Sequence, residues 1–186
     1  MAGNKIFFYV AAFLLTFCHL AQGHEKKWPE RRLRQAWPSA ESFTSKQVAL
    51  SPNQISDLKA EGIEIASNEK NPIFYLAQSK VAAPGSLQNL GAILFVDEPG
   101  DNGLMEISVA IGNDGQIKKI DIWESSENQL ISKDDFLKQF VGKSSKDSFL
   151  TNKDFKPVEA APKASIAVSK AAQKAIKISS LIFKKK

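Results

Sequence analysis

Apolar and polar positions alternate most clearly between residues 105 and 111. The apolar side chains are Met105, Ile107, Val109 and Ile111, and between them stand Glu106, Ser108 and Ala110. A period of two residues predicts a half-buried β-strand. The turn at 113–115 contains Asp-Gly, a strong hairpin signal, so we expect a partner strand at 117–123.

Two helices are expected ahead of this hairpin. Residues 28–36 predict a brief helix with Pro29 in its first turn. The segment 51–54 reads Ser-Pro-Asn-Gln, which is a capping box with serine at the cap and glutamine three positions later. The helix that it starts is expected to stop near Gly62.

Three further strands are expected on the N-terminal side of the hairpin. They lie at 43–50, 73–77 and 90–96, and each is mainly apolar or β-prone in composition. Gly91 falls inside the third strand. Glycine within a strand allows a neighbouring group to approach the backbone closely, which is the role we assign to it.

The C-terminal third predicts two helices. Ser132 is expected to cap a short helix that carries Phe136 and Phe140, and Gly142 closes it. Residues 163–182 form a long helix with a broad stripe of small and apolar side chains at helical spacing. The basic residues expected on its other face are Lys163, Lys170, Lys174 and Lys177.

Together these elements predict an α+β domain with an antiparallel sheet and helices packed on it. The expected organisation is a signal segment at 1–23, a leader at 24–50, one domain at 51–183 and a basic tail at 184–186. With 186 residues, of which 43% are hydrophobic and 24% charged, the chain suits one globular core.

The first 23 residues have the pattern of a secretory signal. Lys5 supplies the positive start, 6–17 is almost wholly apolar, and 21–23 reads Ala-Gln-Gly, a small-x-small cleavage site. We therefore expect a periplasmic or otherwise exported protein. The alternative is an uncleaved signal, which would anchor the chain in the membrane.

Charge and scarce residues exclude several functions. The net charge of +5 is a mild excess without a basic-aromatic cluster, so we expect no nucleic-acid partner. The one cysteine, Cys18, and the two histidines, His19 and His24, all lie near the N-terminus. A multi-cysteine zinc site and histidine-based catalysis are therefore excluded, and we expect no metal. Redox chemistry would need a bound cofactor.

The order of the elements resembles a known family. A strand containing Gly91, the 113–117 hairpin, the segment 123–127 (Trp-Glu-Ser-Ser-Glu), the segment 136–143 (Phe-Leu-Lys-Gln-Phe-Val-Gly-Lys) and a small-residue helix follow one another. Over about residues 90–182 this order is similar to the FMN-binding domain family. That family includes flavin subunits of ion-pumping membrane redox complexes.

The resemblance implies a cofactor site at the start of the last helix. The family motif is Asp-x-x-Ser/Thr-Gly-Ala-Thr, whose threonine can carry FMN through a phosphoester. The matching stretch here reads Glu-Ala-Ala-Pro-Lys-Ala-Ser, so Glu159, Ala164 and Ser165 fall at the acidic, alanine and threonine positions. Lys163 stands where the family has glycine. We therefore expect any FMN to be held without a covalent bond.

A non-covalent FMN phosphate would bind at the N-terminus of this helix, where free N–H groups and the helix dipole attract anions. The expected cofactor-binding residues are Glu124, Glu159, Lys163, Ala164, Ser165 and Ser169. The resemblance then implies an exported FMN-binding protein that transfers electrons with a larger redox system, its partner being a redox protein that can be membrane-bound. The alternative, supported by Lys163, is a flavin-free relative that acts as an interaction or accessory subunit.

Overall fold

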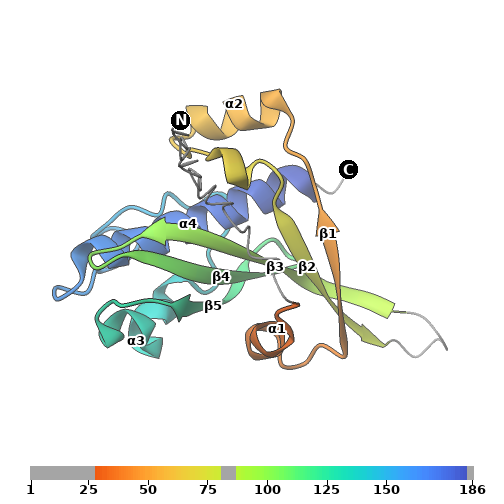
Figure 1. Ribbon diagram of the computed structural model, residues 1–186, viewed down its shortest axis with the longest axis horizontal. Helices are drawn as coiled ribbons and strands as arrows, with labels where there is room; N and C mark the ends of the chain where they lie inside the picture. Colours follow the sequence, from red (N-terminus) through yellow and green to blue (C-terminus); the bar gives the residue numbers. More distant parts are fainter. Residues whose placement is uncertain (1–27, 81–86, 184–186) are drawn as a thin grey trace, which may run out of the picture.

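A computed structural model describes residues 28–80 and 87–183 of the chain (Figure 1). The signal segment predicted at 1–23 and the basic tail at 184–186 lie outside the described residues. Among the helices that are described, none is both long and apolar enough to cross a membrane.

One antiparallel sheet holds all five named strands in the order of the sequence. The strands are β1 (Ser42–Gln47), β2 (Ile73–Lys80), β3 (Leu87–Pro99), β4 (Leu104–Gly112) and β5 (Ile117–Glu124). β4 and β5 form the predicted hairpin, and Gly115 in its turn has a φ of +74°. Each strand pairs with the next strand in the sequence, so no connection has to pass over an intervening strand.

The named α-helices are α1 (Glu30–Ala36), α2 (Pro52–Ala60), α3 (Asp134–Leu137) and α4 (Pro162–Ile182). Short 3₁₀ turns stand at η1 (Ser67–Glu69), η2 (Gln129–Ser132) and η3 (Lys138–Phe140). The predicted capping box at the start of α2 is present, because Ser51 and Gln54 each bond the backbone N–H of the other. The predicted α+β class with an antiparallel sheet is confirmed.

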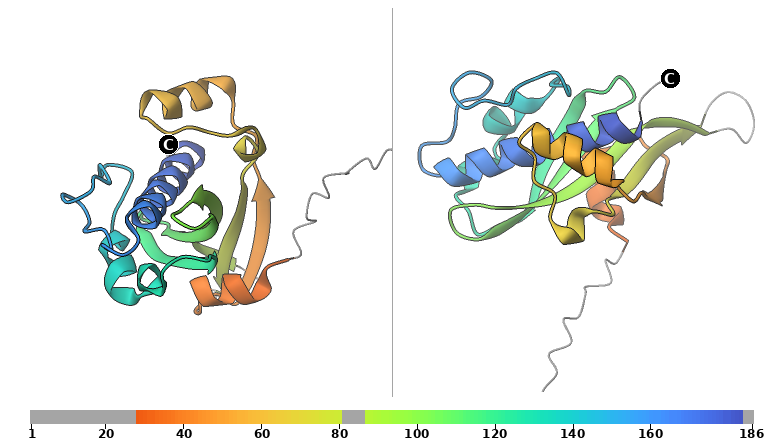
Figure 2. Two further views of the ribbon diagram at one scale, coloured as in Figure 1. Left: turned by 60° about the vertical axis from the view of Figure 1, so that its left-hand side comes forward. Right: turned by 90° about the horizontal axis from the view of Figure 1, so that it is seen from above.

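Helix α4 lies against one face of the sheet, and the sheet curves round it (Figure 2). Its small side chains make this close packing possible, and several are fully buried: Ala164, Ala171, Ala172 and Ala175. They meet the branched side chains of the central strands, including Ile107 and Val109. This layer is the main core.

The opposite face of the sheet is covered by α1 (Figure 1). Leu33 of α1 packs with Tyr75, Ile93 and Ala110 in a second, smaller core. The prediction that β4 is half-buried was therefore wrong: Ser108 is 1% exposed and Ala110 is not exposed at all. Alternation along one strand does not reveal a helix from another part of the chain.

Two other local predictions are corrected. Ser132 does not cap α3, because it already lies inside η2, which Asn128 caps through the N–H of Leu130. Lys133 precedes α3 and makes no side-chain capping bond. Lys174 does not share an open face with the other lysines of α4, since it is only 9% exposed.

The stretch expected to be a leader takes part in the fold. It supplies α1, which covers the sheet, and β1, which pairs with β2 from Ser42 to Gln47. A backbone bond from Glu41 to Gln78 extends this pairing by one residue. The described domain therefore includes residues ahead of position 51.

Candidate functional site

The start of α4 is capped by a residue from far away in the sequence. Pro162 is the first helical residue, and the preceding Ala161 offers no side-chain cap. The backbone N–H of Ala164 instead donates to the carboxylate of Asp101 at 2.8 Å. Asp101 belongs to the turn between β3 and β4. A carboxylate at this position satisfies an N–H group that the helix itself leaves unpaired and complements the helix dipole.

Ser165, at the position of the family's threonine, points into the protein. Its side chain is fully buried. The hydroxyl donates to the carbonyl of Ala161 at 2.8 Å and accepts from the N–H of Val158 at 2.9 Å. The proton of the hydroxyl and one lone pair are thus used in fixing the loop before the helix. Ser165 could turn to a ligand only by breaking these bonds.

Ser169, one turn further along, has a similar structural role. It is 3% exposed, and its hydroxyl donates to the carbonyl of Phe149 at 3.0 Å. Phe149 has a φ of 55°, a conformation that few non-glycine residues adopt. The bond from Ser169 holds this unusual residue against α4.

The remaining predicted site residues are placed differently. Lys163 and Glu159 are exposed at the start of α4 and in the loop before it. Glu124 ends β5, where its backbone pairs with Glu106 of β4. The start of α4 therefore gathers Glu159, Lys163, Ala164 and Ser165. Ser169 is buried one turn along the helix.

This arrangement does not fit the phosphate of FMN. The N–H of Ala164 is already paired with a carboxylate, whose negative charge would repel a phosphate at the same place. The hydroxyl of Ser165 faces inward, and among the described side chains at the start of α4 Lys163 is the exposed cation that could meet an anion. Flavin binding by this chain stays a prediction.

Trp123 is held on the sheet by its own contacts. Its indole N–H donates to the hydroxyl of Ser108 at 2.8 Å, and the guanidinium of Arg32 lies over its ring at 5.4 Å. Ser108 shares the face of β4 that carries Ala110, which α1 covers. These contacts place the Trp123 ring across the sheet from α4.

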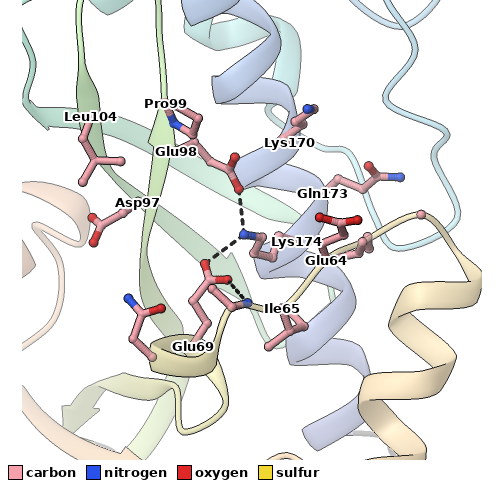
Figure 3. Close-up of a pocket in the computed structure, with 14 residues that line it drawn as sticks. Glu64, Ile65, Glu69, Asp97, Glu98, Pro99, Leu104, Lys170, Gln173 and Lys174 are labelled. Carbon is pink, nitrogen blue, oxygen red and sulfur yellow. Dashed lines mark hydrogen bonds and ion pairs between the residues drawn. The ribbon is translucent and has the colours of Figure 1, made fainter.

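A cavity lies beside the middle of α4. It has a volume of about 800 Å³ and is bounded by the segment after α2, by η1 and by the end of β3. Figure 3 shows Lys174 at its centre, between Glu69 and Glu98. The Nζ atom of Lys174 lies 2.8 Å from a carboxylate oxygen of Glu69 and 2.7 Å from one of Glu98.

The environment of Lys174 favours its charged form. Burial tends to lower the pKa of this ammonium, but the hydrogen bonds and charges of Glu69 and Glu98 outweigh burial and raise the pKa above the ordinary 10.5. The second oxygen of Glu69 accepts from the N–H of Ala66 at 2.8 Å. The ion cluster therefore joins η1, β3 and α4.

The cavity carries more negative than positive charge. The carboxylates that line it are Glu64, Glu69, Asp97 and Glu98, and the lysines are Lys170 and Lys174. Within the described ranges no group of acidic or histidine side chains is arranged to hold a metal ion. Glu69 and Glu98 share one ammonium and cannot act as an acid–base pair while they do so. This local excess of negative charge favours a cationic group at the cavity.

Sequence reasoning did not identify Asp101 at the start of α4, or Lys174 in the cavity, as site residues. Asp101 is 63 residues from its partner, and no local pattern links the two. Lys174 could have been found, because it stands three residues after Ala171 and four before Ile178. Those two side chains belong to the buried stripe, so helical spacing puts Lys174 on the same face.

No protein-family model matches this chain, and no curated protein sequence matches it.

Proposed function

We propose that this protein is an exported accessory subunit that has the resemblance to the FMN-binding domain family but works without flavin. The bond from the N–H of Ala164 to Asp101 carries the proposal. It puts a carboxylate where the family resemblance calls for a phosphate. The inward hydroxyl of Ser165 supports the same conclusion, because the position of the covalent attachment is buried.

The cavity beside Lys174 is the surface that we assign to the partner. Its four carboxylates exceed its two lysines, whereas the whole chain carries a net charge of +5. A basic side chain of another protein would gain from this local excess of negative charge. The partner class follows from the resemblance: a protein of a larger redox system, which can be membrane-bound.

Flavin titration tests the first half of the proposal. The purified protein is expected to be colourless and to leave FMN fluorescence unchanged. Asp101→Asn and Lys163→Ala serve as paired variants, since the first removes a negative charge and the second a positive charge at the helix start. Flavin colour that survives purification, or saturable FMN binding by the wild type, would overturn the flavin-free reading.

A flavin-binding electron carrier is the second candidate, and one observation favours it. Lys163, Ala164 and Ser165 lie in the first turn of a 21-residue helix, and Glu159 lies in the loop just before it. Such a helix has a strong positive end. Non-covalent FMN would then require Asp101 to withdraw, with Lys163 taking the phosphate. This candidate predicts FMN binding that is much tighter than riboflavin binding and that weakens about tenfold in Lys163→Ala.

Affinity purification tests the proposed contact between the partner and the cavity beside Lys174. The tagged wild-type protein and a Glu64→Gln/Asp97→Asn variant would be recovered from the membrane fraction of the source cells. Both substitutions reduce the negative charge of the cavity without touching the partners of Lys174. We expect a redox-complex protein with the wild type and a marked loss with the variant. Equal recovery with both proteins would show that the cavity is not the contact.

A further inference from the structure

A second cavity lies beside the C-terminal half of α4, over strands β2 to β4. Its volume is about 480 Å³, within the range of small-molecule sites. The apolar side chains that line it are Leu76, Ala92, Ile111, Ile176 and Phe183. The cavity is near the opposite end of α4 from Asp101, so it is separate from the predicted flavin site.

Ser179 is one of the residues that line this cavity, and its hydroxyl is unused. The residue is 5% exposed, and within residues 28–80 and 87–183 its oxygen has no hydrogen-bond partner. The neighbouring Ser180 differs, because its hydroxyl donates to the carbonyl of Lys177 at 2.8 Å. A buried hydroxyl without a partner is destabilising, and a ligand with a polar atom at this place would remove that cost.

The rim of the cavity supplies a positive charge. Within residues 28–80 and 87–183, Lys46 of β1 is the one charged residue that lines the cavity. Its Nζ atom lies 6.0 Å from the centre of the Phe183 ring, and no carboxylate of the described residues forms an ion pair with it. An exposed lysine beside an apolar cavity favours a ligand with a negative group next to an apolar body.

We propose that this cavity binds a small amphipathic carboxylate. The apolar body lies on Ala92, Ile111 and Ile176, and the carboxylate accepts hydrogen bonds from Lys46 and Ser179. A ligand with several negative charges fits less well, because Lys46 is the only charged residue among the described residues that line the cavity. This inference does not depend on the accessory role, since the two cavities share no lining residue.

Decanoate and decanol form a matched pair of probes for the purified protein. Backbone amide shifts followed by NMR during titration would locate each ligand. We expect decanoate to shift residues around Ala92, Ile111 and Ser179, and decanol to bind about threefold or more weakly because it lacks the charge. Equal binding of the two, or shifts spread over the whole surface, would overturn the proposal.

Two variants test the polar contacts. Lys46→Gln is expected to weaken decanoate about threefold, with Lys59→Gln of α2 as the control that changes nothing. Ser179→Ala is expected to weaken decanoate about tenfold while the free protein keeps or gains stability, because the unpaired hydroxyl is removed. A purely structural Ser179 would leave the affinity unchanged. Unchanged affinity in both variants would refute the site.

Discussion

The carboxylate of Asp101 and the backbone N–H of Ala164 meet at 2.8 Å across 63 residues of sequence. Their bond joins the β3–β4 turn to the start of the helix that fills the core. The same carboxylate stabilises the helix end and blocks it for anions, because both effects depend on one negative charge beside one free N–H group. Stability and ligand choice at the start of α4 are therefore coupled.

Asp101→Ala is expected to lower the free energy of unfolding by about 0.5–2 kcal/mol, the usual cost of a lost helix cap. Urea denaturation would measure the loss. Asp101→Asn keeps a capping oxygen and should recover most of the stability. Asp97→Ala is the control, since Asp97 is exposed on β3 and forms no ion pair with the described residues. A loss in the control as large as in Asp101→Ala would contradict the capping role.

Replacing Ser165 by the family's threonine should destabilise the protein. The side chain is fully buried and its hydroxyl is bonded on both sides, so an added methyl group has to displace packed neighbours. We expect a loss of about 1–3 kcal/mol for Ser165→Thr. Ser165→Ala should lose a similar amount because the N–H of Val158 is left unpaired. Exposed Ser126→Ala is the control in thermal unfolding, and a stable Ser165→Thr would disprove this account.

Local sequence patterns predicted the structure correctly where bonds between neighbouring residues determine it. The α2 capping box is closed by Ser51 and Gln54 themselves, three residues apart. The β4–β5 turn depends on Gly115, which takes the positive φ that Asp-Gly predicts. The long helix was predicted to within one residue of its observed start, because its apolar stripe is broad and regular.

The sequence patterns did not predict contacts between residues that are far apart in the chain. Burial of Ala110 depends on α1, which lies more than 70 residues earlier and was predicted without a place in the fold. The cap on α4 comes from Asp101, whose own neighbourhood indicates only a turn. Lys174 is buried because Glu69 and Glu98 converge on it from two other elements. Each of these features needs the tertiary structure before it can be recognised.

The close approach to the backbone that was predicted at Gly91 is confirmed. A Cβ atom there would lie 2.1 Å from the carbonyl oxygen of Ile111 and 2.5 Å from the ring of Trp37. Gly91→Ala is expected to cost about 1–3 kcal/mol or more, because backbone and a packed ring would both have to move. Gly100→Ala is the matched control, since the three atoms nearest to its Cβ all belong to the side chain of Glu127 and not to backbone. Equal unfolding midpoints for the two variants would contradict the prediction.

Removal of the Lys174 ammonium should be the most damaging of these changes. Lys174→Met leaves Glu69 and Glu98 facing each other in a largely buried place, and we expect a loss of about 3–5 kcal/mol. Lys174→Met combined with Glu69→Gln and Glu98→Gln removes all three charges and should recover much of that loss. If the triple variant is less stable than Lys174→Met, charge repulsion is not the cause.

The contribution of Lys174 also has a defined pH dependence. Its pKa is raised in the folded protein, so the stabilisation is fully present below the ordinary value of 10.5 and is lost as the pH rises through the folded value. Tyr75 acts in the same direction, because burial and then the charge of Glu106 raise its pKa above 10.0. Urea unfolding between about pH 9 and pH 12 should therefore use Tyr75→Phe as the background. In that background stability should fall at the alkaline end, and adding Lys174→Met should flatten the curve; parallel curves would show that Lys174 does not couple protonation to folding.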